Sequence, residues 1–399
     1  MIKNFMFTSE SVTEGHPDKL CDQISDSIVD YLMMQDPYAK VRAECAVSAA
    51  ILFIAARFQS DAQIDFTHLA RKTIKRVGYT QPDFNPQSCS ILCTPQALPP
   101  DQSVRFDETA LSEKEINEIT VKNQATVFGF ACSQTPEFMP YPIWLAHKLA
   151  KRLTEVRKQK VLPYVRPDGR VQVGVEYIDR IPKRIHSLII HVHRQAPDKP
   201  GTKKLIDDIR ETVLEPICRT SAICPDAKTK ILINPEGPYL GGPTNHSGLT
   251  GRKSAIDTYG EYTRHSGKAL SGKDPSRIDR IGAYAARYAA KNIVAAGLAD
   301  ECEIMISYSP GLSMPVSLVA QSMGTSSLPD ERLTDIVKKH FDFRFAALLQ
   351  KFRLRHLPAT HPNGFYQMLA AYGHFGRTDM DLPWEKTDMV DILKDEIKC

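Results

Sequence analysis

Three short segments of the sequence gather side chains that suit phosphate and metal chemistry. The first covers residues 14–19 and contains His16, Asp18 and Lys19 at the start of a predicted helix. A helix N-terminus presents free N–H groups and a partial positive charge, so it attracts anions. We interpret this segment as a candidate phosphate site, and a capped helix with solvated charges is the alternative.

The second and third segments are also basic. Residues 241–253 form a glycine-rich stretch that ends in Arg252 and Lys253, and glycines let a backbone approach a ligand closely. The stretch does not match the Walker phosphate-binding pattern, so a glycine-rich surface turn is its alternative. Residues 271–279 place Lys273 and Arg277 beside Asp279. An ordinary charged helix start is the alternative for this third segment.

Taken together, the three segments predict a triphosphate site. They supply five fixed cations and one titratable donor, which are His16, Lys19, Arg252, Lys253, Lys273 and Arg277. Asp18 and Asp279 are carboxylates of the kind that Mg²⁺ prefers. The sequence context shows no nucleophile–base pair of the Ser-His-Asp type. We therefore expect transfer from a polyphosphate nucleotide rather than hydrolysis through a covalent intermediate.

Alternating helix and strand patterns must position these segments. Apolar residues at helical spacing after Pro17 predict a helix that ends at Asp36-Pro37, and a second helix fits residues 66–77. Ser112 and Glu115 have capping-box spacing in a charged helical stretch, residues 111–124. Further helices are expected at residues 140–158, 204–217 and 278–298, and strands at residues 41–58, 171–175, 188–192, 231–233 and 303–308. This alternation favours a mixed α/β or α+β architecture.

The composition excludes several classes of protein. The 399 residues are 42% hydrophobic and 25% charged, which are globular values, so the chain is not expected to be disordered. The longest apolar run, Ala46–Ala56, is too short to span a membrane, and the N-terminus has no apolar core of signal-peptide length. A net charge of +4 without a basic stripe argues against a nucleic-acid partner. Nine scattered cysteines are expected to be free thiols, which favours a cytoplasmic location.

The motifs around the three segments are long and specific. They include FTSESVTEGHPDK at residues 7–19, GLTGRK at residues 248–253, SGKDP at residues 271–275 and AYGHFGR at residues 371–377. Over nearly its whole length the sequence resembles the S-adenosylmethionine synthetase (methionine adenosyltransferase) family. The resemblance implies an α/β (α+β) fold of three similar sheet-plus-helix domains with pseudo-threefold symmetry. We place the domains at residues 1–105, 115–236 and 237–399, with spatial domains interleaved between these segments.

The resemblance also implies a reaction and its partners. A nucleophile, which is L-methionine in the family, attacks C5′ of ATP and expels triphosphate. The triphosphate is then cut to diphosphate and phosphate before release. Such an in-line displacement depends mainly on orientation and charge stabilisation. The family implies two Mg²⁺ ions and K⁺ as cofactors, and a homodimer or homotetramer with shared active sites.

Roles for individual residues follow from the positions that match the family. His16 would contact the triphosphate and the 5′ oxygen, and it is grouped with the catalytic cations Lys19, Arg252, Lys253 and Lys273. Asp18 and Asp279 would bind Mg²⁺, and Glu44 matches a potassium ligand. The positions that match ATP contacts are His16, Asp168, Arg170, Tyr239, His246, Arg252, Lys253 and Lys273.

The acceptor side of the site departs from the family pattern. Arg57 stands where the family has an acid, Leu98 where it has Gln, and Asn123 and His246 where it has Asp. Arg277 replaces a Lys that meets the substrate carboxylate. Three acids that could balance an ammonium group are therefore missing, and a buried unpaired charge costs several kcal/mol.

The sequence leaves four hypotheses for the function. The first is a methionine enzyme with a rebuilt pocket, and the second is the same chemistry on an amine-free or anionic nucleophile. The third is an ATP or tripolyphosphate hydrolase, in which water replaces the nucleophile. The fourth is a silent regulatory relative, which would not need the intact His16, Asp18, Lys19, Lys253 and Lys273.

Overall fold

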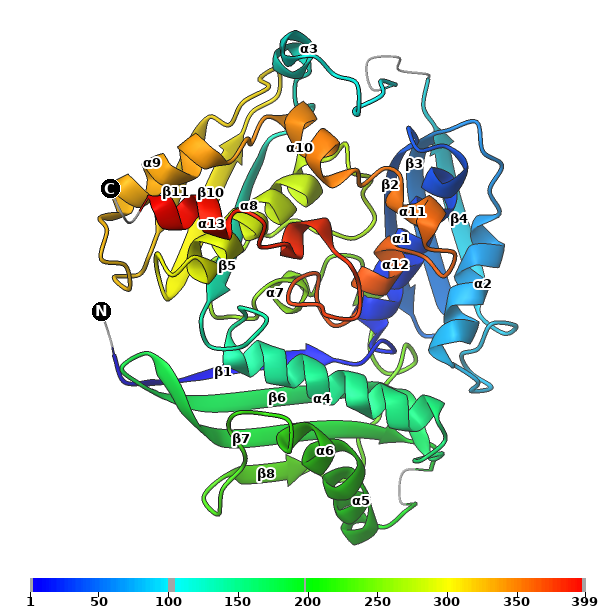
Figure 1. The fold of residues 1–399 in the computed structure, drawn as a ribbon. Helices are drawn as coiled ribbons and strands as arrows, with labels where there is room; N and C mark the ends of the chain where they lie inside the picture. The colour runs from blue at the N-terminus through cyan, green and yellow to red at the C-terminus, as the bar shows by residue number, and fades with distance from the viewer. Residues whose placement is uncertain (1–2, 100–104, 197–198, 397–399) are drawn as a thin grey trace.

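Three β-sheets surround a group of central helices. The computed structural model describes residues 3–99, 105–196 and 199–396, and Figure 1 shows the sheets on the outside with the long helices turned inward. Each sheet carries one long helix: α1 (Pro17–Gln35) packs on β2, α4 (Tyr141–Lys158) on β1 and β6, and α8 (Ile278–Ala295) on β5 and β10. The predicted α/β (α+β) fold of three sheet-plus-helix units is confirmed.

The first sheet has the strand order β1-β6-β7-β8. Its β7–β8 pair is parallel and its other pairs are antiparallel. The strands are β1 (Phe5–Val12), β6 (Val165–Ile178), β7 (Ile181–Arg194) and β8 (Lys230–Ile233).

The second sheet has the order β4-β3-β2-β9, with β3 and β4 parallel, and the antiparallel third sheet has the order β11-β10-β5. The strands are β2 (Lys40–Ser48), β3 (Ile51–Gln59), β4 (Ser90–Ala97), β9 (Gly248–Leu249), β5 (Ala125–Cys132), β10 (Glu301–Tyr308) and β11 (Ser317–Gln321). Each sheet thus combines strands that are far apart in the sequence. The predicted domain boundaries stay a prediction.

Shorter helices complete the fold, several of them in the last quarter of the chain. They are α2 (Phe66–Val77), α3 (Glu113–Glu118), α5 (Thr202–Ile209), α6 (Glu215–Cys218), α7 (Ser254–Asp257), α9 (Asp330–His340), α10 (Phe345–Phe352), α11 (Leu357–Thr360), α12 (Tyr366–Leu369), α13 (Val390–Asp395), the π-helix η2 (Arg210–Leu214) and the 3-10 helix η3 (Pro383–Glu385). None of the described helices is long and apolar enough to cross a membrane.

Helix α1 is the central element of the site. His16 caps it, because its ring Nδ1 accepts the N–H of Asp18 at 3.2 Å, and Pro17 occupies the first turn, where its missing N–H is not needed. Leu20 and Ile24 have no exposed surface and lie in the continuous hydrophobic core. The start and end predicted from the sequence, Pro17 and Asp36, are confirmed.

Three of the predicted helices and strands differ from those in the structure. The helix expected over residues 204–217 is broken by η2, because Pro216 has no N–H to donate to the preceding turn. The strand expected over residues 41–58 is a hairpin of β2 and β3 that turns at Ala49, which has a φ of 50°. The helix expected over residues 111–124 is only α3, which keeps its capping box between Ser112 and Glu115.

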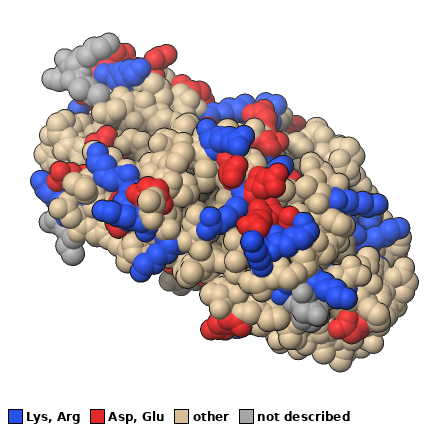
Figure 2. Space-filling view, turned by 90° about the horizontal axis from the view of Figure 1, so that it is seen from below, with Lys and Arg blue, Asp and Glu red and all other residues tan. Residues whose placement is uncertain are grey.

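Charge is mixed on the surface. Figure 2 shows Lys and Arg side chains interspersed with Asp and Glu on the face seen from below, with no continuous basic stripe there. None of the eight cysteines in the described part of the chain forms a disulfide, and most of them are buried.

Candidate active site

The first two basic segments lie side by side at the N-terminus of α1. Gly248 permits this approach, because a Cβ at this position would lie 2.2 Å from the backbone of Pro17. Strand β9 pairs with β2 through Ala46 and Leu249, and the Leu249 N–H donates to Asp18 Oδ1 at 3.0 Å. The structure therefore brings His16 and Asp18 close to the segment that carries Arg252 and Lys253.

Helix α1 anchors the loops through a row of four carboxylates, of which sequence reasoning assigned only Asp18. Asp18, Asp22, Asp26 and Asp30 are spaced by four residues and share one face of the helix. Each accepts a backbone N–H from a distant segment, and the donors are Leu249 (3.0 Å to Asp18), Gly251 (2.7 Å to Asp22), Gly272 (2.8 Å to Asp26) and Tyr366 (2.9 Å to Asp30). The four-residue spacing of these acids in a helix rich in apolar residues is the sequence signal from which the row could have been predicted.

His16 is buried and electrically neutral. Burial, followed by the charges of Lys253 and Arg170, lowers the pKa of His16 to about 2. Because Nδ1 accepts the Asp18 N–H, the ring proton resides on Nε2. His16 thus offers a neutral N–H donor at the helix mouth across the whole physiological pH range.

Tyr239 and Asp168 form a pair near His16. Asp168 lies on β6, and Tyr239 lies in the loop after β8. Tyr239 stacks on His246, with ring centroids 6.1 Å apart, and the Arg170 guanidinium lies 5.6 Å from the Tyr239 ring centroid. Asp168 Oδ2 accepts the Gly242 N–H at 2.7 Å. The Asp168 Oδ1 and His246 Nε2 atoms are buried without a hydrogen-bond partner among the described residues. Such atoms are candidates for contact with a ligand.

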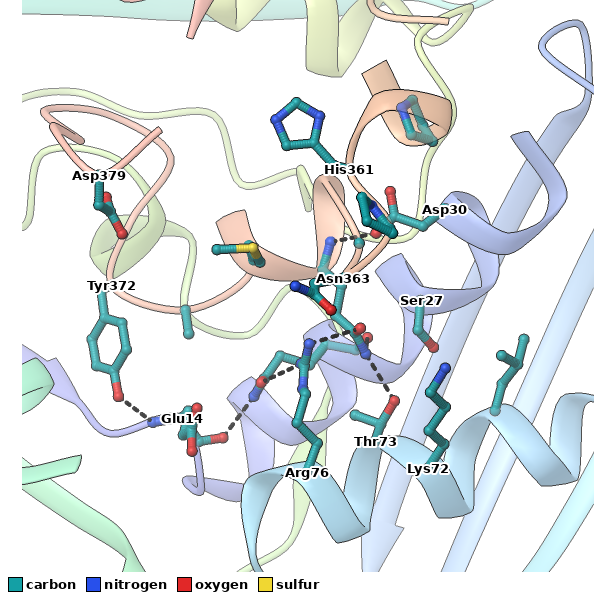
Figure 3. Close-up of a pocket in the computed structure, with 18 of the residues that line it drawn as sticks. Glu14, Ser27, Asp30, Lys72, Thr73, Arg76, His361, Asn363, Tyr372 and Asp379 are labelled. Atoms are coloured by element: carbon teal, nitrogen blue, oxygen red, sulfur yellow. Dashed lines mark hydrogen bonds between the residues drawn. The ribbon is translucent and has the colours of Figure 1, made fainter. Parts of the chain in front are cut away.

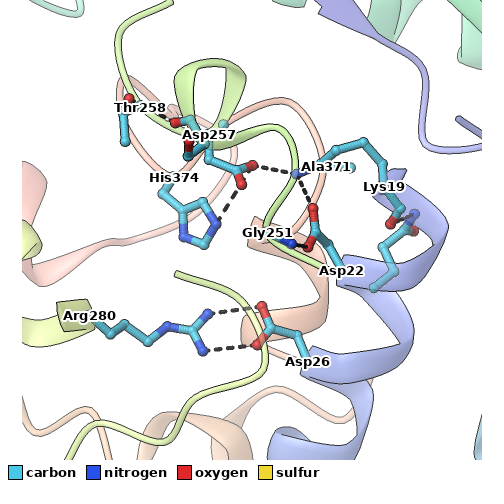
Figure 4. Close-up of polar contacts among 12 residues, drawn as sticks. Lys19, Asp22, Asp26, Gly251, Asp257, Thr258, Arg280, Ala371 and His374 are labelled. Carbon is cyan, nitrogen blue, oxygen red and sulfur yellow. Dashed lines mark hydrogen bonds and ion pairs between the residues drawn. The ribbon is translucent and has the colours of Figure 1, made fainter. Parts of the chain in front are cut away.

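Lys19 is separated from the residues around His16 by its own ion pairs. Its side chain is fully buried, and its ammonium is held by Asp22 Oδ2 at 2.8 Å and by the Asp257 carboxylate (Figure 4). Burial alone lowers the pKa of Lys19, but the two carboxylates outweigh it and raise the pKa above its usual value. This placement does not support the predicted contact between Lys19 and a triphosphate. It gives Lys19 a role in fixing α1 to the segment that contains α7.

The third basic segment forms a separate group. Lys273 Nζ lies 3.7 Å from Asp279 Oδ2, and the Asn123 Nδ2 group donates to the same oxygen at 2.9 Å. Lys268 approaches Asp279 Oδ1 at 3.4 Å. Burial lowers the pKa of Lys273, and Arg277 is one of the cations that adds to this effect. The third segment therefore brings together Asn123, Lys273, Arg277 and Asp279, whereas the other two positions expected around an acceptor amine, Arg57 and His246, lie elsewhere in the chain.

Arg280 positions this third group. Gly272, with a φ of 77°, passes so close to β2 that a Cβ would lie 2.1 Å from the Ala43 carbonyl oxygen. Arg280 binds both oxygens of Asp26 at 2.9 Å, and its Nη1 also donates to the Lys273 carbonyl at 2.7 Å. Arg280 and Asp26 are both completely buried (Figure 4). The ion pair thus fixes the backbone of residues 272 and 273 against α1.

The remaining acceptor-side residues lie on the outer face of the second sheet. Arg42 and Arg57 are directly opposite each other on β2 and β3, and both are exposed. Arg42 binds Glu44 Oε1 at 2.8 Å, so the predicted potassium ligand is engaged in an exposed ion pair. Leu98 follows β4 and donates its N–H to the Phe58 carbonyl at 2.7 Å. A cavity of about 450 Å³ lies over these strands and is lined by Arg42, Glu44, Ala55, Ala56, Arg57, Thr94, Pro95 and Gln96.

The two cationic groups are electrostatically distinct within the chain. The fixed cations that lower the pKa of His16 are Lys253, Arg170 and Lys19. The charged groups that shift the pKa of Lys273 are Asp279, Arg42, Lys268 and Arg277. Each group contains one carboxylate that the sequence assigned to Mg²⁺, and no three His, Cys, Asp or Glu side chains in the described ranges form a ready-made metal site. The arrangement fits an ion held largely by phosphate oxygens, because Mg²⁺ usually takes only one or two protein carboxylates in such sites.

Comparison with known proteins gives matches along the whole chain. The families described as S-adenosylmethionine synthetase N-terminal, central and C-terminal domain match residues 4–98, 118–239 and 240–386. A protein named S-adenosylmethionine synthase from Gloeothece citriformis (strain PCC 7424) is 48% identical, over 99% of this chain and 98% of its own length. Proteins of the same name from Microcystis aeruginosa (strain NIES-843 / IAM M-2473) and Trichodesmium erythraeum (strain IMS101) are 47% and 46% identical, over 100% and 99% of this chain and 99% and 97% of their own lengths.

Proposed function

The chain belongs to the S-adenosylmethionine synthetase family, and from this premise we propose that it transfers the adenosyl group of ATP to the sulfur of a thioether acid. In this reaction a sulfur lone pair forms a bond to C5′ while the C5′–O5′ bond breaks, and triphosphate leaves with the bonding electrons. Water then cleaves the triphosphate to diphosphate and phosphate. The observation that carries the proposal is the neutral, buried His16 at the helix mouth beside Lys253, Arg170 and the Tyr239–Asp168 pair.

Each part of this cluster suits one part of ATP. The Tyr239 ring offers a face for the adenine base, and Asp168 and Arg170 suit ribose hydroxyl groups and phosphate. Arg252 and Lys253 follow the glycine-rich segment and suit the triphosphate, to which each charged hydrogen bond contributes about 1.5–3 kcal/mol. His16 Nε2–H is available to the departing 5′ oxygen.

We further propose that Asp18 and Asp279 hold two Mg²⁺ ions and that Glu44 contributes to a K⁺ site. Bound Mg²⁺ would neutralise charge on the triphosphate. Asp18 already accepts the Leu249 N–H through one oxygen, which fixes the direction of the carboxylate. Asp279 Oδ1 is buried and accepts no hydrogen bond among the described residues, and its one charged neighbour there is Lys268 Nζ at 3.4 Å. Both side chains therefore retain capacity for a metal that is held mainly by phosphates.

A second copy of the chain is proposed to complete the site. The Lys273 group and the His16 group have different charged neighbours within one chain, whereas a site that binds triphosphate would use both groups. Large apolar side chains are exposed on the second sheet and at its edge, and they are Ile51, Phe53, Leu92 and Leu249. Covering this face in a homodimer or homotetramer would remove the side chains from water and bring the third segment of one subunit to the first two segments of another.

The Lys273 group is expected to serve the triphosphate rather than the adenosine. In Lys273→Ala, ATP affinity should fall by about tenfold or more, because one charged contact to phosphate is lost. Adenosine affinity should change little. Isothermal titration with ATP and with adenosine measures both, and Lys122→Ala is the control because Lys122 is exposed in a neighbouring segment. Equal losses for both ligands would remove Lys273 from the triphosphate site.

The cavity beside Arg57 bears on the identity of the acceptor. Among its lining residues Glu44 is the only acid, and Arg42 already engages it. An acceptor carboxylate can be held by Arg57, but an α-ammonium group finds no free carboxylate in this lining. Charge complementarity therefore favours an acceptor that carries a carboxylate and lacks the amine.

Competition between acceptors tests this prediction. At fixed ATP with Mg²⁺ and K⁺, 4-(methylthio)butanoate should be adenosylated with a higher kcat/KM than methionine, and mass spectrometry identifies the product. Arg57→Glu should shift the preference toward methionine, and Arg57→Gln is the control that removes charge without reversing it.

A low KM for methionine and a clear preference over the amine-free acid would make methionine the acceptor. Release of adenosine or ADP alone would indicate a hydrolase, and no turnover would indicate a silent relative.

A further inference from the structure

A second cavity lies on the helical side of the molecule. It has a volume of about 550 Å³, which is in the range of small-molecule sites, and it is bounded by α1, α2, the end of α4 and residues 358–379 (Figure 3). The second sheet alternates between residues that face α1 and residues that face outward, such as Arg42 and Arg57. Helix α1 therefore separates this cavity from the cavity beside Arg57 on the outer face.

The cavity carries positive charge that its own acids do not neutralise. Lys72 and Arg76 are one turn apart on α2, and both extend into the cavity in Figure 3. Neither forms an ion pair with a carboxylate within the described residues. Among residues 3–99, 105–196 and 199–396, Arg76 donates only to amide oxygens, to Gln23 Oε1 at 3.0 Å and to Gln367 Oε1 at 2.8 Å. A guanidinium has five N–H donors, so Arg76 keeps donors for a ligand.

The four acids that line the cavity already have partners, and one of them, Glu155, pairs with Arg152 at 3.3 Å. Glu14 pairs with Arg157 at 3.0 Å and with Lys158 at 2.6 Å. Asp379 pairs with Arg377 and Lys151. Asp30 accepts the N–H groups of Tyr366 and Gln367 through its two oxygens. Loss of water around the guanidinium lowers the pKa of Arg76, and the charges of Glu14 and Asp30 oppose this effect without reversing it.

Apolar side chains form the rest of the wall. Met34 and Met368 are partly exposed there, and Leu69, Tyr31 and Pro358 line the same space. The cavity thus combines a cationic floor with an apolar wall. This combination suits a ligand that has an anionic group at one end and a hydrocarbon or aromatic body at the other.

We propose that this cavity binds a small organic anion, a carboxylate or a phosphate ester with an apolar body, and that its occupancy regulates the site at His16. Lys72 and Arg76 bind the anionic group, and Met34, Leu69 and Met368 contact the body. The inference on binding stands without the proposed function, and only the regulatory part rests on it.

The coupling runs through the turn that precedes α1. Gln23 Nε2 donates to the Glu14 carbonyl at 2.7 Å, and Gln23 Oε1 accepts from Arg76. On the other side of the same residue, the Glu14 N–H donates to the Tyr372 hydroxyl at 3.2 Å. The cavity wall therefore holds both backbone groups of Glu14, two residues before His16. A ligand that draws Arg76 away from Gln23 loosens one of these two contacts.

Calorimetric titration of the whole protein tests binding with 4-phenylbutanoate and phenyl phosphate as probes. We expect saturable binding of at least one anion, and the uncharged 4-phenylbutan-1-ol should bind at least about tenfold more weakly. Lys72→Gln and Arg76→Gln should each weaken binding of the anion by about tenfold. Lys75→Gln is the matched control, because Lys75 is exposed on the same helix and does not line the cavity. Lys72 is also exposed, so its variant is expected to fold.

Different results test anion binding in the cavity and regulation of the site at His16. Failure of both anions to bind, or equal binding by the wild type and Lys72→Gln, would each overturn the second site. Binding that persists with saturating ATP supports it. A rate of adenosyl transfer that changes with the probe in the wild type, but not in Lys72→Gln, supports regulation, and binding without a change in rate overturns that part. Because calorimetry does not depend on turnover, failure of the proposed function leaves the binding result intact.

Discussion

Replacing His16 with alanine is expected to slow adenosyl transfer by about 10²–10³-fold, while cleavage of added tripolyphosphate is retained. The Asp18 N–H holds Nδ1, so the ring presents a preorganised Nε2–H donor. A fixed donor gains strength as charge develops on the departing 5′ oxygen, and this happens only in the displacement step. Rates of product formation from ATP and from tripolyphosphate measure the two steps separately.

His16 also caps α1, so the variant must be separated from a folding defect. His16→Asn is the matched variant, because asparagine is a favoured N-cap residue but its shorter amide does not reproduce the imidazole donor. It should keep the thermal stability of the wild type and still lose transfer activity. His265→Ala, at an exposed position, should change neither property. Equal losses of transfer and tripolyphosphate cleavage would contradict the assignment to one step.

The low pKa of His16 adds a pH expectation. Because burial and nearby cations lower the pKa of His16 to about 2, the imidazole stays neutral in the free enzyme at every pH where the protein is assayed. The profile of kcat/KM against pH reports groups of the free enzyme, so it should contain no limb from His16 between about pH 5 and 9. A limb in this range that disappears in His16→Asn would show that the ring titrates there.

Replacing Arg280 with methionine is expected to lower the free energy of unfolding by about 3–5 kcal/mol. The change removes two 2.9 Å hydrogen bonds to Asp26 and leaves that carboxylate in the core with only the Gly272 N–H. Burial already raises the pKa of Asp26 ahead of the opposing effect of Arg280. Without Arg280 the charged form is disfavoured further, so the loss should shrink as the pH falls and Asp26 becomes protonated. Denaturant unfolding at several pH values measures this trend.

Two controls define the origin of that loss. The double variant Asp26→Asn/Arg280→Met removes both charges and should recover much of the stability, because the penalty comes from the charge that is left alone. Arg332→Met breaks the exposed pair with Glu396 and should cost no more than about 1 kcal/mol. If Arg280→Met cost no more than Arg332→Met, the Asp26–Arg280 pair would not anchor residues 272 and 273.

The sequence alone predicted the parts of the fold that depend on local signals. Pro17 and Asp36 bound α1, and Ser112 with Glu115 caps α3, because capping and proline geometry act within a few residues. Strands β1 and β5 and the helices after residue 329 were not predicted. Strand β1 has its only hydrogen-bonded neighbour in β6, more than 150 residues later, so its signal was not local.

The sequence alone also determined the family and the residue types of the site, because the motifs around His16, Arg252 and Lys273 are long and specific. Only the tertiary structure decided what these residues contact. It buried Lys19 between Asp22 and Asp257, and it placed Lys273 in a different group from His16. The physical reason is that these positions are set by hydrogen bonds between α1 and loops more than 200 residues away, and such pairings leave no trace in local spacing.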